Sequence, residues 1–463
     1  MKVRRVGTIG VPMLVFALCL CPVPVQAGEP TETRRVYRCT LDECYRLALQ
    51  RSPLMEAARI SVAQYASKAR EANTVFLPKF EVNGFLSVLP ALKPGKNGSE
   101  PLEDYDFTNL GPLAVGSIGL AQTIWTAGKV SSLKKLASEG VDIARATVRV
   151  AEDELRYLLS RAWWGLVLVA DLQDLTKDIR RLLDEQRAKL EKQRDEADEG
   201  FNQSDLLRLN VYGAEIEEKL RQFERNRQQA LDGVRMALGE KSDLDIDAAG
   251  ELTPVSVPPL PVEAVEALAI ANAPRYLAQR GGVRARLLQV DAAKANLWPD
   301  VLFIARVAAT YAPTRDSSSD SLAANPSNAA TTGLGIVLRW TLDIWRQLEK
   351  VEQAELDARQ AALQVAGERE KLRMDVRQLW REMVDAQAMI GVQEKAHKAA
   401  RGLLTAETQA YDDGFQDFAE VLKAMESYTR RRLAHAEAIY TYNMAVAAVA
   451  RQAGAGLTLA EPR

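Results

Sequence analysis

The chain contains one segment twice, in residues 43–85 and 264–306. The copies align without a gap at a constant offset, and identical residues recur at Ala48/Ala269, Pro53/Pro274, Ala57/Ala278, Arg59/Arg280, Val62/Val283, Ala72/Ala293 and Pro78/Pro299. The repeat that these pairs define is far longer than a solenoid unit of roughly 20–50 residues. The duplication therefore predicts two large structural repeats, over residues 28–253 and 254–463.

The first 27 residues have the pattern of a secretory signal peptide. Basic residues precede an apolar run of 9–21, and Val25-Gln26-Ala27 forms a small-residue cleavage site. Lipidation at Cys21 is an alternative that the sequence leaves open, although Leu20 is a poor residue before a lipidated cysteine. No later run reaches the roughly 18 apolar residues of a membrane helix. We therefore expect an exported protein, which could enter a membrane only as β-strands.

Two proline-free stretches, 113–253 and 327–461, predict long helices. Apolar residues recur every three or four positions from Leu155 to Leu182, as in a coiled-coil seam. A helix over 127–197 would be about 105 Å long, and its counterpart is expected over 344–410. Glycine-containing turns should end both helices, and returning helices are expected over 205–239 and 417–453, with a linker at 241–261.

Four β-strands are expected, at 79–89, 113–123, 300–311 and 333–342. Apolar residues alternate with small or polar ones, as in membrane-barrel strands. Aromatic residues flank the strands and would form a girdle at one membrane face: Phe76, Trp125, Trp298, Trp340 and Trp345. The alternative is that these residues fill a soluble core. Four strands cannot close a barrel, whereas three copies would supply twelve.

Outside the signal peptide the cysteines are Cys39 and Cys44. Thr40 and Glu43 fit a capping box at a helix start, which places the two cysteines at positions that touch. In an oxidising compartment a disulfide is one interpretation. Two apolar thiols that pack without a bond are the other.

These features together resemble the TolC family of outer-membrane efflux proteins. The resemblance covers about 41–455. It depends on the duplication, on the openings Ala48–Pro53 and Ala269–Pro274, on the Leu77-Pro78 and Trp298-Pro299 steps, and on Trp-Thr-Ala-Gly-Lys at 125–129.

The resemblance implies a mainly α fold with β, in which a long-helix coiled-coil α-barrel is joined to four strands per chain. A homotrimer would then form a 12-stranded β-barrel in outer-membrane lipid, with a portion that spans the periplasm. It also implies two partners, a periplasmic adaptor (membrane fusion protein) and an inner-membrane transporter.

The resemblance also implies gate residues near the helical tips: Tyr411, Glu420, Lys423 and Asp205. The family has an acidic residue where Lys423 stands and often an arginine where Gln416 stands, so strong cation selectivity is not expected. Each of these residues could equally be a solvent-exposed charge or cap at a helix end, without a role in gating. The turns are the sites expected to dock the adaptor, through Gly200, Phe201, Gly414 and Phe415.

The sequence lacks the motifs of an enzyme. It has no P-loop, Rossmann fingerprint, nucleophile elbow or metal-ligand spacing, and no basic stripe typical of nucleic-acid binding. We expect no cofactor and no catalysis. The leading function is therefore an outer-membrane exit duct for small molecules. The alternatives are the exit channel of a type I protein secretion system, metal-ion export, and a periplasmic coiled-coil scaffold without a pore.

Overall fold

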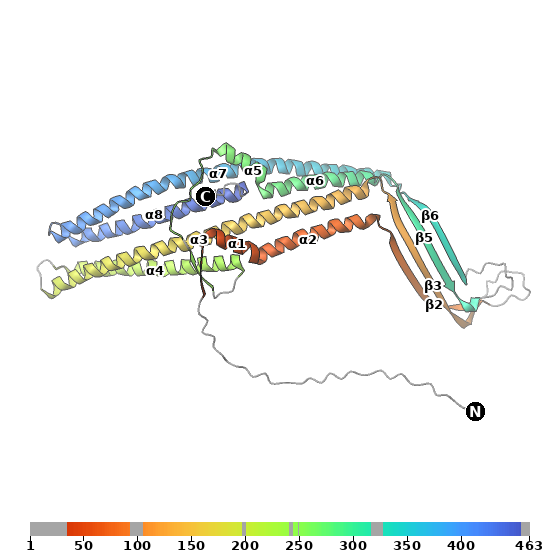
Figure 1. The fold of residues 1–463 in the computed structure, drawn as a ribbon, viewed down its shortest axis with the longest axis horizontal. Helices are drawn as coiled ribbons and strands as arrows, with labels where there is room; N and C mark the ends of the chain where they lie inside the picture. Colours follow the sequence, from red (N-terminus) through yellow and green to blue (C-terminus); the bar gives the residue numbers. More distant parts are fainter. Residues whose placement is uncertain are drawn as a thin grey trace, which may run out of the picture.

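The computed structural model describes residues 35–92, 105–196, 201–239, 244–248, 250–315 and 327–454. The expected signal peptide and Cys21 lie outside these residues. The molecule is elongated, with two long helical hairpins at one end and a β-sheet at the other (Figure 1). The predicted fold class, mainly helical with four long strands, is confirmed.

Each repeat runs helix, helix, strand, strand, long helix, returning helix. The first contains α1 (Leu41–Arg51), α2 (Pro53–Asn73), β2 (Lys79–Leu92), β3 (Tyr105–Trp125), α3 (Lys129–Asp195) and α4 (Gln203–Leu238). The second contains α5 (Val262–Asn272), α6 (Pro274–Ala295), β5 (Asp300–Tyr311), β6 (Ala329–Arg339), α7 (Ile344–Asp412) and α8 (Phe418–Ala453). Short 3-10 turns lie at Thr74–Phe76 and Pro313–Arg315.

The duplication in sequence is also a duplication in structure. The starts of α1 and α5, of α2 and α6, and of β2 and β5 are all separated by the same offset that relates the two sequence copies. Beyond the strands the offset is slightly smaller, and it is the same for α3 and α7 as for α4 and α8. From the first helix to the start of the returning helix, the two repeats therefore differ in length only around the strands. The long helices and the turns after them have equivalent positions in both repeats.

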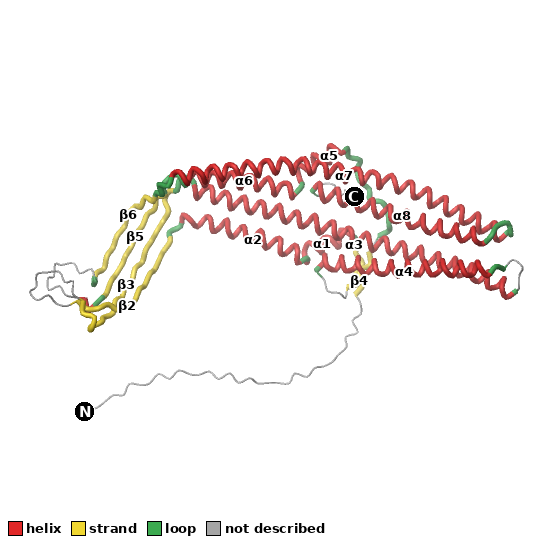
Figure 2. Tube along the Cα trace, turned by 180° about the vertical axis from the view of Figure 1, so that it is seen from behind, coloured by secondary structure: helices red, strands yellow, loops and turns green. Residues whose placement is uncertain are grey.

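The four long strands form one antiparallel sheet in the order β2-β3-β5-β6 (Figure 2). Two strands are longer than predicted, since β2 reaches Leu92 and β3 begins at Tyr105, inside the expected loop. Pro112 lies within β3, where the strand pairs with β2 alone; pairing with β5 begins at Ala114. A proline is tolerated there because its missing N–H can face the unpaired side.

A second, two-stranded sheet was not predicted. The strand β1 (Arg35–Cys39) pairs in parallel with β4 (Leu244–Ala248), which lies in the segment expected to be only a linker. The Trp163 indole on α3 donates to the Cys39 carbonyl at 3.3 Å. This sheet therefore attaches both the start of the first repeat and the link to the second to the middle of α3.

Three buried clusters hold the helices together. One joins α1 and α4 to the middle of α3 and contains Leu159, Trp163 and Val234. The second lies near the helical tips, where α3 and α4 pack against α8 through Leu190, Leu209 and Phe418. The third packs α5 against α7 and α8. The tip cluster fixes the position of one hairpin against the other, so it also positions the candidate gate residues.

Candidate functional site at the helical tips and the sheet

One face of the sheet is apolar and uncovered. Val82 is 76% exposed, Leu86 82% and Leu334 80%. The same face carries further large apolar side chains that are also exposed: Phe80, Val88, Ile118, Val307, Ile336 and Leu338. Exposed apolar surface of this extent marks a site of interaction with lipid or protein.

The opposite face mixes small and polar residues with a few apolar ones, among them Phe85 and Ile304. The strand register aligns Glu81, Gly119, Arg306 and Gly333 in one row across the sheet. The Arg306 guanidinium lies 3.5 Å from the Ser117 hydroxyl, to which it donates. The two faces therefore differ as those of barrel strands do, because the first face is apolar and the polar residues are on the second.

The five predicted girdle aromatics lie where the helices meet the sheet. Trp125, Trp298, Trp340 and Trp345 are exposed. The Trp340 indole donates to the Leu297 carbonyl at 3.2 Å. The Lys134 ammonium lies over the Phe76 ring, 5.2 Å from its centroid. All four strands meet the helices at the same end of the sheet (Figure 1). These aromatics therefore lie at one level along the molecule.

The turn between α7 and α8 carries a solvent-exposed phenylalanine, Phe415. Gly414 has φ +78°, a conformation that glycine adopts without strain. The N–H of Phe415 donates to the Ala410 carbonyl at 2.8 Å and closes the turn. The side chain of Phe415 is 85% exposed. The other tip is only partly described: Phe201 is half-buried, and Gly200 lies outside the described residues.

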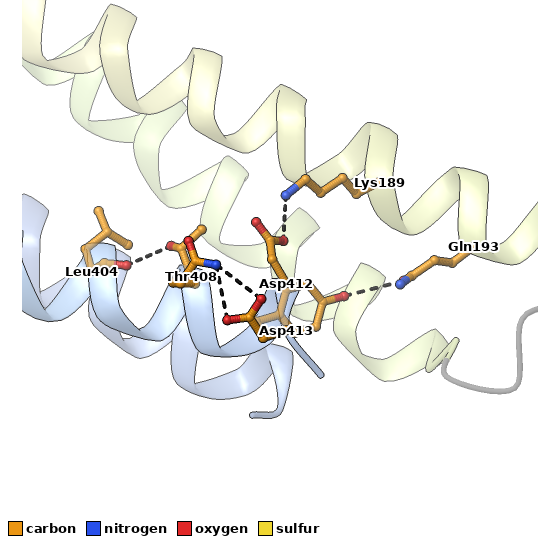
Figure 3. A network of polar contacts seen from close by, with 8 residues as sticks. Lys189, Gln193, Leu404, Thr408, Asp412 and Asp413 are labelled. Carbon is orange, nitrogen blue, oxygen red and sulfur yellow. Dashed lines mark hydrogen bonds and ion pairs between the residues drawn. The ribbon is translucent and has the colours of Figure 1, made fainter. Parts of the chain in front are cut away.

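The predicted gate residue Tyr411 contacts the other hairpin. Its hydroxyl donates to the Gln193 side-chain oxygen on α3 at 3.4 Å, and its ring packs edge-on against Phe418. The Lys189 ammonium pairs with Asp412 at 2.7 Å (Figure 3). Burial raises the pKa of Tyr411 above its ordinary value. The last turn of α7 is therefore fastened to α3 by two polar contacts.

The other gate candidates make local contacts. Glu420 and Lys423 form an ion pair within α8, so the lysine neutralises the acidic residue one turn before it. Asp205, at the start of α4, lies 3.6 Å from Arg208. Burial raises the pKa of Asp205, and the charge of Asp417 adds to the rise. Asp205 and Asp417 therefore bring two acidic groups together between the tips.

Cys39 and Cys44 are joined by a disulfide across the start of α1. The capping box predicted there is present, since the Glu43 N–H donates to the Thr40 hydroxyl at 3.3 Å and the Thr40 N–H donates to the Glu43 carboxylate at 2.9 Å. The bond lies in the same cluster as the sheet of β1 and β4.

Some contacts at the tips could not be found from the sequence. Lys189 and Gln193 are one helical turn apart, and this spacing placed them on one helical face without indicating what they face. The structure shows that they face the end of α7. The chain's two histidines, His397 and His435, also prove to be neighbours, with ring centroids 5.8 Å apart.

Comparison with known proteins identifies the second repeat. Residues 266–455 match the family model described as outer membrane efflux protein. The second repeat is therefore similar to this family of outer-membrane efflux proteins. The predicted resemblance to the TolC family of outer-membrane efflux proteins is confirmed.

Three solved structures show that the whole chain has the fold of this family's channels. VceC of Vibrio cholerae is 18% identical with a TM-score of 0.71, and the match covers 90% of this chain and 96% of VceC. CmeC of Campylobacter jejuni is 14% identical with a TM-score of 0.72, covering 91% and 87%. MtrE of Neisseria gonorrhoeae, in its open state, is 15% identical with a TM-score of 0.71, covering 90% and 89%. No curated protein matches the chain.

Among the described residues, no helix of this efflux protein is both long enough and apolar enough to cross a membrane.

Proposed function

We propose that three copies of this chain form the exit duct of a tripartite efflux system that exports small molecules across the periplasm and the outer membrane. The observation that carries this proposal is the open sheet. Among the described residues, its edge strands β2 and β6 each pair on one side only, and nothing covers its apolar face. Unpaired strand edges are not tolerated in lipid, so the sheet needs partners on both edges.

Further copies of the same chain can supply these partners, because each copy has the same two open strand edges. Each copy would pair its β2 with β6 of the next, and three copies would close a barrel of twelve strands. The polar row that contains Glu81 and Arg306 would then line the lumen. The same three-fold arrangement would close the hairpins α3–α4 and α7–α8 into a tube that crosses the periplasm.

The partners of the duct would be a periplasmic adaptor and an inner-membrane transporter. We place the adaptor at the tips because Phe415 is exposed there without contacts that its own fold requires. Energy for transport would come from the transporter. Opening would follow movement of the α7–α8 pair away from α3, with Tyr411 and Asp412 released, and with Glu420, Lys423 and Asp205 bordering the passage.

The lipid-facing side of the sheet is tested by a matched pair of substitutions on β6. Ile336→Lys would place a charge on the apolar face, whereas Val337→Lys would place the same charge on the opposite face. A lysine facing lipid near the bilayer midplane costs about 2–4 kcal/mol, while lumen positions tolerate charge. We expect Ile336→Lys to abolish the trimer recovered from outer membranes and Val337→Lys to leave it assembled. Equal effects of the two substitutions would contradict the proposed barrel.

A further inference from the structure

The two histidines of the chain meet between α7 and α8. The rings of His397 and His435 stack at an interplanar angle of 20°. Tyr428 packs on His397 with ring centroids 5.6 Å apart. Both histidines are half-buried, and Nε2 of His397 is buried without a hydrogen-bond partner within the described residues. Neutral rings can remain in such a stack, but charged rings would lose water and repel each other.

The charges around the pair are predominantly positive. Lys398 and Arg401 on α7 and Arg432 on α8 are cations, whereas the acidic groups are Glu394 on α7 and Asp171 on α3. Both carboxylates already have partners.

Glu394 pairs with Lys398 at 2.6 Å, and one oxygen of Asp171 pairs with Arg432 at 2.7 Å. The second Asp171 oxygen is buried without a partner among the described residues. Burial, followed by the charge of Arg432, lowers the pKa of each histidine below its ordinary value.

We propose that His397 and His435 form an acid-sensitive latch, which holds α7 against α8 at neutral pH and loosens when both rings are protonated. Two like charges about 6 Å apart in protein surroundings shift a local equilibrium by at least about tenfold. Linkage gives the direction of the pH effect. A histidine whose pKa is lowered in the folded state stabilises that state fully above its unfolded pKa, and this contribution is lost as pH falls through the lowered folded pKa.

The latch lies on the hairpin proposed to move. His397 precedes the end of α7 at Asp412 by about four helical turns, or about 22 Å of helix. Arg432 beside the rings is also the residue that ties α8 to Asp171 on α3. Loosening at the histidines would therefore act where α8 is also tied to α3. If the chain is the duct proposed above, an inference on which this part depends, acid in the periplasm would favour its opening.

Among the described residues, no group of three or more His, Cys, Asp and Glu side chains could hold a metal ion. A switch by protons therefore agrees better with the geometry than a switch by metal.

The test is hydrogen–deuterium exchange of the full-length protein at pH 7.5 and 5.5 with EDTA present, in wild type and in His397→Gln/His435→Gln. Glutamine keeps polarity and volume but does not titrate. After correction for intrinsic rates, we expect exchange over 394–401 and 428–439 to rise at least about tenfold on acidification in wild type and to stay constant in the double variant. An equal response of the two proteins would overturn the latch.

A second variant tests whether charge at the pair, and not another effect of low pH, loosens the helices. His435→Lys carries a permanent charge and should show fast exchange in both segments already at pH 7.5; slow exchange there would overturn the proposal. Single-channel recording of the same proteins separates this inference from the proposed function. A pH-dependent exchange without conductance at either pH would leave the latch standing and contradict the duct.

Discussion

At the scale of single residues, the helical tips depend on a few polar contacts between hairpins. Tyr411 and Asp412 reach across from α7 to Gln193 and Lys189 on α3. Glu420 and Lys423, by contrast, pair within one helix and tie nothing together between elements. Of the gate candidates, Tyr411 is therefore the one that joins the two hairpins by a hydrogen bond, whereas Asp205 faces Asp417 of the other hairpin with a like charge.

We predict that Tyr411→Phe combined with Asp412→Asn raises the open probability of the channel in planar bilayers about five- to tenfold. The change removes one neutral hydrogen bond and one exposed ion pair, together worth about 1–1.5 kcal/mol, and leaves the Tyr411 ring on Phe418. Thr408→Ala is the matched control, because among the described residues the Thr408 hydroxyl bonds only to Leu404 of its own helix. An unchanged open probability, or an equal rise in the control, would contradict the gating role of Tyr411.

Asp153 on α3 predicts a pH dependence of stability. Burial raises its pKa to about 6, and the charge of Glu152 adds to the rise. The folded state therefore binds a proton that the unfolded state releases, and stability falls as pH rises through about 6. Asp153→Asn should raise Tm at pH 7.5, with a gain that shrinks below pH 5. Thermal unfolding of both proteins at the two pH values checks this, and a gain that grows at low pH would contradict it.

At the scale of elements, the turn between α7 and α8 presents a side chain that its own fold does not use. Phe415 is 85% exposed. We predict that Phe415→Ala changes the free energy of unfolding by less than about 0.5 kcal/mol but weakens binding to the periplasmic adaptor by at least about 1 kcal/mol. Affinity for the purified adaptor and thermal unfolding give the two readouts.

Phe201→Ala is the comparison at the other tip, where the ring is half-buried. It should lower Tm more than Phe415→Ala does. Unchanged adaptor affinity of Phe415→Ala would remove this turn from the docking surface.

The sequence predicted the elements whose signals are local. Long proline-free seams indicated α3 and α7, and period-two alternation with flanking Pro steps indicated the four long strands. The small sheet was missed because β4 is a short strand with two aspartates, which disfavour strands, and because its partner β1 lies at the opposite end of the first repeat. The extension of β3 through Pro112 was missed because proline normally ends a strand.

The candidate site was predicted only in part for the same reason. The resemblance to the TolC family indicated Tyr411 and Glu420, and the two turns were found because they recur in both repeats. Periodicity shows which face of a helix is apolar, but not which other helix faces it. The partners Lys189 and Gln193, and the approach of His397 to His435, therefore required the structure.

At the scale of the whole molecule, the duplication accounts for the shape. The offset between equivalent elements changes only across the strands, so two matched hairpins lie side by side and extend from one shared sheet (Figure 1). The sheet keeps two open edges and one apolar face. In the proposed duct a single chain would be incomplete, and copies of the same chain would supply the strand partners of both edges.

The most direct test of this account is the mass of the detergent-purified outer-membrane protein, measured together with its conductance in a planar bilayer. The account predicts a mass three times that of one processed chain and small, stepwise conductance from that same species. A monomer or dimer that does not conduct would contradict the duct and favour a coiled-coil scaffold without a pore.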